Sequence, residues 1–322
     1  GANERALEKA QALPADALIL DLEDACPYEF KGEKSRKVAV KALNTLDFGK
    51  KIVCVRPNNA LSPFFLGDLE AIVLEAPNRF HGIVLPKATG PDDVILLSRL
   101  LDDLERRGGW KRRIQIEALI ETPLALVRAH AIATASDRMC GLIFGIADFA
   151  ANLGIREIVE DQNRNFHYAK QSMVVAAKAA GLHAIDNVYI RITRIEDPPG
   201  RKHEIEHGLR EKNLGAAAIG MDGTWVIHPQ QAKIANECFT PTPEQVAHAK
   251  RVVELYHDKG GGSMADPETG EMIDEATIKI ALMELAKAVQ NGDITAEYLA
   301  KQAAKSREVT GYDVLALFRR NT

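Results

Sequence analysis

Short runs rich in β-branched residues recur along the chain about every thirty residues, with amphipathic helical stretches between them. Strands that alternate with helices in this way indicate βαβ units, whose strands pair in parallel. We therefore predict a (β/α)8 TIM barrel, with an open doubly wound sheet as the alternative. The seven expected strands are residues 17–22, 52–55, 82–85, 114–120, 141–145, 184–190 and 216–220.

The first residues read as the start of a helix, with Asn3 as its candidate cap. A barrel begins with a strand, so we expect its first strand to lie upstream and to be missing from this chain. The length of 322 residues suits a barrel of ~250 residues with an appendage. We predict a catalytic barrel domain over residues 1–240 and a C-terminal helical extension over residues 241–322.

Gly260-Gly261-Gly262-Ser263 interrupts this extension and has the composition of a flexible hinge. We expect it to let the following segment act as a lid over a barrel mouth or reach a neighbouring subunit. A plain linker is the alternative.

Composition limits the partners of the chain. The net charge of −4 provides no basic surface, so we expect neither nucleic acid nor a membrane as partner. Cys26, Cys54, Cys140 and Cys238 are scattered and form no Cys-x-x-Cys pair, which is typical of reduced core thiols. With no signal peptide and no apolar run of ~18 residues, we expect a cytoplasmic location.

Two carboxylates stand where apolar strands end. Glu121 follows the run at 114–120, and Asp148 follows the run at 141–145. The carboxyl ends of parallel strands are where α/β enzymes bind ligands. Because Mg²⁺ prefers oxygen ligands and keeps open positions for water or substrate, the pair predicts a divalent-metal site for Mg²⁺ or Mn²⁺. The alternative is that both residues are helix caps.

Other charged residues follow strands in the same manner. Asp21-Leu22-Glu23-Asp24 is too acidic to be buried unpaired, so we expect it beside the metal or paired with a cation such as Arg56. Arg56 offers a planar fork for a carboxylate or a developing enolate oxygen, with a structural salt bridge as the alternative. We interpret Lys87 as a charge-pairing residue rather than a Schiff-base lysine.

The histidines give no strong signal for catalysis. His228 is interpreted as a core or loop residue more readily than as a general base. From their spacing we expect no zinc site.

Read in order, several motifs resemble the malyl-CoA lyase and citrate lyase beta-subunit family, which is HpcH/HpaI aldolase-like. The resemblance extends from residue 1 to about residue 290. The motifs are Leu-Asp-Leu-Glu-Asp-Ala, Val-Arg-Pro-Asn, Leu-Pro-Lys, Ile-Glu-Thr-Pro, Gly-Ile-Ala-Asp-Phe-Ala-Ala-Asn-Leu-Gly, Trp-Val-Ile-His-Pro-Gln-Gln and Ala-Asn-Glu-Cys-Phe-Thr-Pro.

The resemblance implies a Mg²⁺-dependent barrel enzyme in which Glu121 and Asp148 hold the metal and Arg56 stabilises the enolate oxygen. Met272-Ile273-Asp274-Glu275-Ala276 matches the lid motif of malyl-CoA lyases, which implies that Asp274 completes the site of an adjacent subunit in a homo-oligomer, a trimer or hexamer. Lys9 is the best matching candidate for a CoA contact.

The implied reaction is a retro-Claisen cleavage, or its reverse, of a 3-hydroxyacyl-CoA thioester such as malyl-CoA to acetyl-CoA and glyoxylate. The alternatives are a citrate lyase beta subunit acting on a carrier-bound thioester, a malyl-CoA thioesterase on the same scaffold, and a non-catalytic binding protein. Asp186-Asn187-Val188 and the basic loop through Arg194 and Arg201 depart from the family pattern, which leaves the substrate open.

Overall fold

The computed structural model describes residues 3–158, 164–311 and 313. The chain divides into two compact units, Gly1–Asn236 and Glu237–Thr322.

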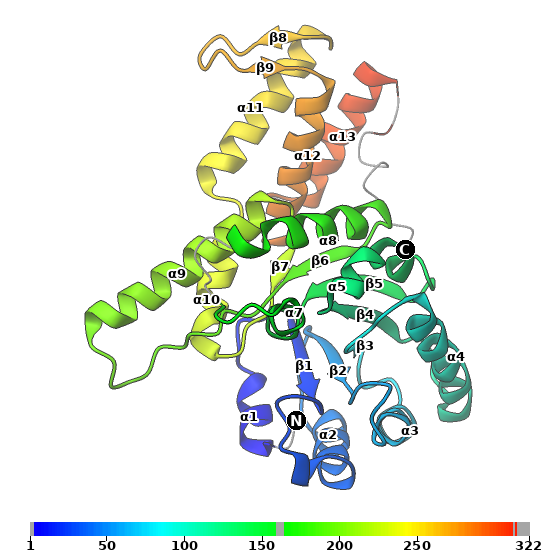
Figure 1. The fold of residues 1–322 in the computed structure, drawn as a ribbon. Coiled ribbons are helices and arrows are strands. Elements are labelled where there is room, and N and C mark those ends of the chain that lie inside the picture. Colours follow the sequence, from blue (N-terminus) through cyan, green and yellow to red (C-terminus); the bar gives the residue numbers. More distant parts are fainter. Residues whose placement is uncertain (1–2, 159–163, 312, 314–322) are drawn as a thin grey trace. The chain divides into compact units, whose positions relative to one another are not determined.

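In the described part of the first unit, seven strands form one parallel sheet whose spatial order follows the sequence. The sheet curls as part of a barrel, with helices along its outer face (Figure 1). In register, Asp21 lies opposite Arg56 at the carboxyl ends of β1 and β2. The strands are β1 (Ala17–Asp21), β2 (Ile52–Arg56), β3 (Gly82–Leu85), β4 (Gln115–Ile120), β5 (Met139–Phe144), β6 (His183–Asp186) and β7 (Gly223–Thr224).

An apolar layer fills the concave side of this sheet. It combines one side chain from each of β1 to β6 with Trp225, which follows β7. Such layers are typical of TIM-barrel interiors, because alternate residues of each strand point inward. The layer contains Ile19, Cys54, Val84, Leu119, Ile143, Ile185 and Trp225.

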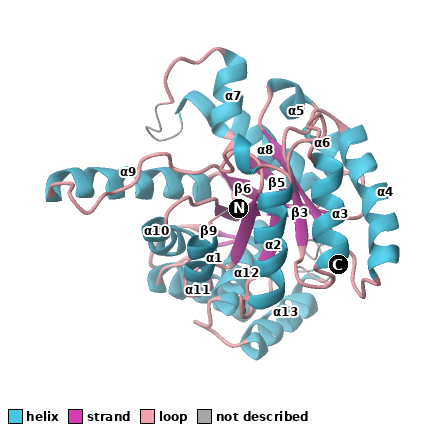
Figure 2. Ribbon diagram, turned by 90° about the horizontal axis from the view of Figure 1, so that it is seen from below, coloured by secondary structure: helices cyan, strands magenta, loops and turns pink. Residues whose placement is uncertain are grey.

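Helices surround the strands of this unit (Figure 2), and α2 to α9 return the chain from one strand to the next. In α4 (Pro91–Gly108), Pro91 occupies the first turn and Gly109 ends the helix in the left-handed conformation. Its buried residues Val94, Leu97, Leu101 and Leu104 recur at helical spacing and face the sheet. The other helices are α1 (Glu4–Ala10), α2 (Glu33–Thr45), α3 (Phe65–Glu75), α5 (Pro123–Val127), α6 (Ala129–Ala133), α7 (Ile146–Leu153), α8 (His167–Ala179), α9 (Pro199–Ala218) and α10 (Pro229–Phe239), with 3-10 turns at Tyr28–Phe30 and Arg164–Phe166.

The strand expected at residues 216–220 is wrong. Residues up to Ala218 belong to α9, and the seventh strand is the short Gly223–Thr224. The Gly-Ala-Ala-Ala run has no β-branched residue, and alanine has the highest helix propensity, so the run extends the helix. The strand expected at 184–190 also ends earlier, at Asp186.

The described part of the second unit is helical apart from one small hairpin. Helices α11 (Pro243–Lys259), α12 (Glu275–Gln290) and α13 (Ala296–Thr310) accompany the antiparallel strands β8 (Met264–Ala265) and β9 (Met272–Ile273). Val253 of α11 and Leu282 of α12 are fully buried in one shared core.

The glycine run is not a hinge between the two units. Gly260 ends α11 in the left-handed conformation, and Gly261 and Gly262 continue with positive φ into the hairpin. Because α11 and α12 share a core on either side of this turn, the run lies inside the second unit. The expected flexible hinge at Gly260–Ser263 is therefore wrong, and the run is a turn between packed helices.

All four cysteines are free thiols; Cys26, Cys54 and Cys238 are buried and Cys140 is partly buried, as predicted. Among the residues that the structure describes, no helix combines the length and apolar character needed to span a membrane.

Candidate active site

Glu121 forms the buried centre of a charged cluster at the carboxyl ends of the strands. It directly follows β4, and only 2% of its surface is exposed. Its Oε1 accepts a hydrogen bond from the backbone N–H of Lys87, which follows β3. Two adjacent strands thus fix the position of this carboxyl group.

Gly145 makes room for Glu121. It follows β5, and a Cβ atom built on it would lie 2.5 Å from Glu121 Cβ and 2.9 Å from Glu121 Oε2. Carbon atoms in contact are normally about 3.5–4.0 Å apart, so no larger residue fits without displacing Glu121. The glycine in Phe-Gly-Ile-Ala-Asp is therefore required by the neighbouring strand.

Asp148 lies in the first turn of α7, directly after β5, and is partly buried. The structure brings Asp148 close enough to Glu121 for its negative charge to act on the Glu121 carboxyl group. Burial, followed by the charges of Asp148 and Glu23, raises the pKa of Glu121 to about 8. A cation bound between these carboxylates would offset both the cost of burying a charged Glu121 and its repulsion by the neighbouring carboxylates.

The donor set fits a hard divalent cation. Glu121 and Asp148 offer only oxygen, which Mg²⁺ prefers, and the ion commonly completes its shell with water and substrate. Within the described residues, no group of three or more His, Cys, Asp or Glu side chains forms a protein-only metal centre. The arrangement therefore suits a metal held by few protein ligands and open to substrate.

Arg56 is held rigidly beside this cluster. Its Nε and Nη2 donate to the two carboxylate oxygens of Asp21 at 2.7 and 2.5 Å, and its Nη1 lies 3.4 Å from Glu23 Oε2. The guanidinium also lies 5.5 Å from the centre of the Trp225 ring. Although burial opposes its charge, Asp21 keeps a lowered pKa because of Arg56. The expected pairing of Arg56 with the acidic run is confirmed.

Lys87 supplies the second cation. Its Nζ lies 3.2 Å from Glu23 Oε1 and 3.4 Å from Asp24 Oδ1, so the predicted charge-pairing role is confirmed. Its backbone adopts φ of 51°, which is uncommon for a residue other than glycine and costs about 1–3 kcal/mol. This conformation aims its N–H at Glu121.

Glu23 is more central than its sequence position suggested. It is 1% exposed and contacts both Arg56 and Lys87, whereas Asp24 beside it is largely exposed. Burial and the charge of Asp24 raise the pKa of Glu23. The sequence motif identified the acidic run as a whole, but only the structure shows that Glu23 is buried and Asp24 is exposed.

Two other candidates belong to the ends of helices of the first unit. Lys9 is exposed in the last turn of α1. His228 accepts at Nδ1 from the N–H of Gln230 at the start of α10, which supports its interpretation as a loop residue.

Asp274 belongs to the second unit and is the N-cap of α12. Its Oδ1 accepts from the N–H groups of Ala276 and Thr277 at 2.9 and 3.0 Å. The hydrogen bond from Thr277 is the main reason why the pKa of Asp274 is lowered.

A buried ion triad at the end of β6 was missed from the sequence. Asp186 is fully buried between Lys170 of α8 and Lys212 of α9, at 2.7 and 2.9 Å. Although burial disfavours its charge, the two lysines lower the pKa of Asp186. The sequence could have indicated this triad, because Lys170 and Lys212 occupy helix positions that otherwise carry inward-facing residues.

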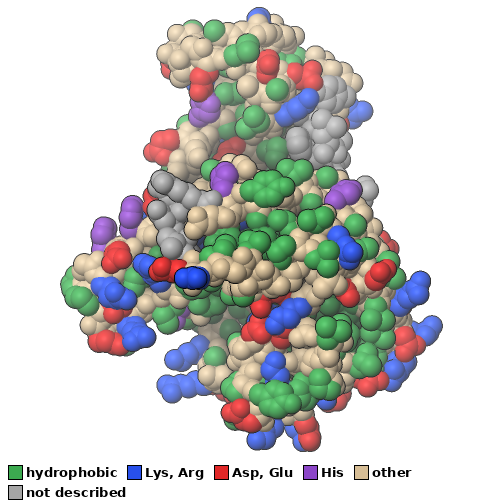
Figure 3. All heavy atoms as spheres, in the orientation of Figure 1, with side chains coloured by type: hydrophobic (Ala, Val, Ile, Leu, Met, Phe, Trp, Pro, Cys, Tyr) green, Lys and Arg blue, Asp and Glu red, His purple; other side chains and the backbone are tan. Residues whose placement is uncertain are grey.

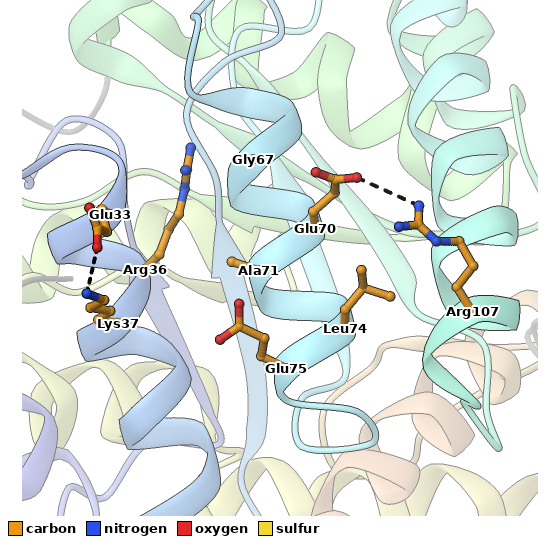
Figure 4. Close-up of a pocket in the computed structure, with 9 residues that line it drawn as sticks. All are labelled: Glu33, Arg36, Lys37, Gly67, Glu70, Ala71, Leu74, Glu75 and Arg107. Atoms are coloured by element: carbon orange, nitrogen blue, oxygen red, sulfur yellow. Dashed lines mark hydrogen bonds and ion pairs between the residues drawn. The ribbon is translucent and has the colours of Figure 1, made fainter.

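A surface groove of about 570 Å³ lies between α2 and α3 (Figure 4). Four of its charged residues already form ion pairs, Glu33 with Lys37 at 2.6 Å and Glu70 with Arg107 at 3.7 Å. None of the charged cluster lines it, so we place the candidate site at the strand ends instead.

Comparison with known proteins finds relatives that match most of the chain. The family model described as HpcH/HpaI aldolase/citrate lyase matches residues 1–229. An L-malyl-CoA/beta-methylmalyl-CoA lyase of Cereibacter sphaeroides is 30% identical over 87% of this chain and 90% of its own. A (3S)-malyl-CoA thioesterase of the same species is 32% identical over 89% of this chain and 92% of its own.

Two solved structures are also similar. The CitE protein of Mycobacterium tuberculosis, in complex with magnesium, acetoacetate and coenzyme A, is 28% identical, with a TM-score of 0.70 over 89% of this chain and 94% of its own. A citrate lyase from Burkholderia xenovorans has a TM-score of 0.78 at 20% identity and covers 94% of both chains. This likeness shows the barrel fold predicted from the sequence.

Proposed function

The chain belongs to the HpcH/HpaI aldolase/citrate lyase family, and from this premise we propose that it is a Mg²⁺-dependent lyase of a 3-hydroxyacyl-CoA such as malyl-CoA. The observation that carries the proposal is the buried Glu121 carboxyl group at the strand ends, whose pKa the charge of Asp148 helps to raise. A lyase of malyl-CoA among the relatives, and a magnesium and coenzyme A complex among the structural neighbours, support it.

In the proposed reaction the C3 hydroxyl group gives its proton to water and the C2–C3 bond breaks. The aldehyde of glyoxylate forms at C3, and the bonding electrons pass into the thioester as an enolate. Protonation of the enolate carbon then gives acetyl-CoA. Glu121 and Asp148 would hold the metal, which supplies a positive charge that lowers the pKa of the hydroxyl group and polarises the carbonyl.

Arg56 would stabilise the enolate oxygen. Its guanidinium is already fixed by Asp21 and by the Trp225 ring, so orienting it at the moment of reaction costs little. Glu23 and Lys87 would position the loop ends around it, since Lys87 contacts Glu23 through Nζ and Glu121 through its backbone.

Asp274 would exchange the proton at the enolate carbon as a general acid–base. We further propose that it serves the barrel of an adjacent subunit in a trimer or hexamer, and that Lys9 contacts CoA. The lowered pKa of Asp274 favours its carboxylate form, which is the base needed when acetyl-CoA is deprotonated in the synthetic direction.

A thioesterase is the second candidate, because the malyl-CoA thioesterase is as similar to this chain as the lyases are. Incubation with malyl-CoA and citramalyl-CoA, with Mg²⁺ or with a chelator, distinguishes the two. A lyase releases glyoxylate or pyruvate, trapped as a hydrazone, together with acetyl-CoA. A thioesterase releases free malate and CoA.

The matched variants are Glu121→Ala/Asp148→Ala and the control Asp103→Ala/Asp137→Ala, whose carboxylates form exposed ion pairs with arginines. We expect only the first pair to abolish turnover and Mg²⁺ binding by calorimetry. Unchanged Mg²⁺ affinity in Glu121→Ala/Asp148→Ala would refute the metal site. Release of neither product by the wild-type chain would refute both enzymatic proposals.

A further inference from the structure

We propose that His203 and His207 of α9 form a second metal site, a surface chelate for a transition-metal dication such as Zn²⁺ or Ni²⁺. This goes beyond the proposed lyase function and uses none of its residues. The segment His203-Glu204-Ile205-Glu206-His207 places the two imidazoles four residues apart on a helix. The expectation that the histidines contain no zinc spacing overlooked this pair and was wrong.

The two rings lie on one face of the helix and close to each other. Residues four apart lie on the same helical face, and these rings stack with centroids 6.3 Å apart and planes 9° apart. Two imidazoles that bind one ion at about 2.0–2.1 Å through nitrogen have centroids at most about 6.4 Å apart. That limit applies when the two ring nitrogens face each other across the ion. The stacked rings do not, so both must turn about their side-chain torsions and approach one another to share an ion, which residues four apart on one helical face allow. Both side chains are exposed, and histidine side chains lie at the surface over α9 in Figure 3.

The opposite face of α9 is anchored. Ile205 and Leu209 are buried against Tyr189, and Gly208 approaches so closely that an added Cβ would lie 2.3 Å from the Tyr189 hydroxyl oxygen. The helix is therefore fixed before any ion binds. Only the rotamers of His203 and His207 must be ordered, which keeps the entropic cost of binding low.

The ligand chemistry selects the ion. Imidazole suits Zn²⁺, Ni²⁺ and Cu²⁺, whereas Mg²⁺ prefers carboxylates and water. Glu204 is paired with Arg191 at 3.5 Å, and the described residues contain no third His, Cys, Asp or Glu gathered with the pair as a metal-binding group. Water therefore completes the shell. The residues match the His-Glu-x-x-His pattern of zinc hydrolases, but the exposed rings support binding and not a shielded catalytic centre.

The experiment is a titration of the full chain with Ni²⁺ and then Zn²⁺ by calorimetry, in excess Mg²⁺ so that the carboxylate site is filled. The test variants are His203→Ala, His207→Ala and the double variant. The control is His130→Ala/His167→Ala, which removes two exposed histidines that lie on different helices. Light scattering on the same samples reports the mass.

We expect one ion per chain, an unchanged mass, and an affinity loss of the order of 10²-fold in either single variant, because the second ligand of a chelate acts at high effective concentration. The control should retain wild-type affinity. Equal affinity in wild type and the double variant would overturn the proposal, as would the absence of binding to wild type. A doubled mass with half an ion per chain would also overturn it, by showing that two copies share the ion.

Discussion

Gly145→Ala tests whether the geometry of Glu121 controls the reaction. The new Cβ would lie 2.5 Å from Glu121 Cβ, about 1 Å inside the normal carbon–carbon contact distance. Glu121 or the backbone after β5 must therefore move by about that amount. A displacement of about 1 Å in a catalytic arrangement can cost 10²-fold in rate, and overpacking costs about 1–3 kcal/mol of stability.

We expect Gly145→Ala to lower metal-dependent turnover by about 10²-fold and to weaken Mg²⁺ binding, measured by product release and calorimetry, with urea unfolding for stability. Gly200→Ala is the matched control, because no atom lies within 4 Å of its added Cβ and its φ is not positive. Wild-type turnover and Mg²⁺ affinity in Gly145→Ala would refute the reasoning. A loss of stability alone would show that the contact is structural.

Three further predictions concern single groups. With a pKa of about 8 in the folded protein against an ordinary 4.5, Glu121 keeps a proton that the unfolded chain releases, so without metal the free energy of unfolding should fall as pH rises across that window. Glu121→Gln should make this slope smaller in urea titrations, and an unchanged slope would contradict the assignment. Arg56→Lys keeps the charge but loses the fork to Asp21, so kcat should fall by about 10²–10³-fold while calorimetric Mg²⁺ affinity persists; a wild-type kcat would leave Arg56 as a structural salt bridge. Asp274→Asn should reduce cleavage by about 10²–10⁴-fold. Its stability in urea should change little, since asparagine caps helices as well as aspartate does. If mixing Asp274→Asn protein with inactive Arg56→Ala protein under subunit exchange restores no activity, the adjacent-subunit role of Asp274 fails.

The sequence by itself determined the order and the chemistry of the strand ends. Alternation of apolar runs with amphipathic helices predicted a parallel sheet, because local hydrophobic periodicity is set by which faces are buried. Because parallel strands end at the same edge of a sheet, the acidic and basic residues that follow the apolar runs were expected to lie close together there. Glu121, Asp148 and Arg56 were predicted as site residues in this way, and the contacts of Arg56 and Lys87 with the acidic run show that the strand ends meet.

Only the tertiary structure decided which of these groups are buried and what their neighbours demand. The burial of Glu23, the raised pKa of Glu121 and the need for Gly145 depend on atoms from different strands. Lys170 and Lys212 could not be joined to Asp186 from their positions in the sequence, because they come from separate helices.

The glycine run at residues 260–262 also shows that local sequence does not reveal tertiary packing. Its composition indicated a hinge, but composition does not reveal that the flanking helices share a core, which fixes the turn between them. Local pattern determines which segments can form a helix, a strand or a turn. Packing between distant segments decides which groups are buried away from water and which are held in place. Burial affects the charge of the site residues, and packing sets their positions.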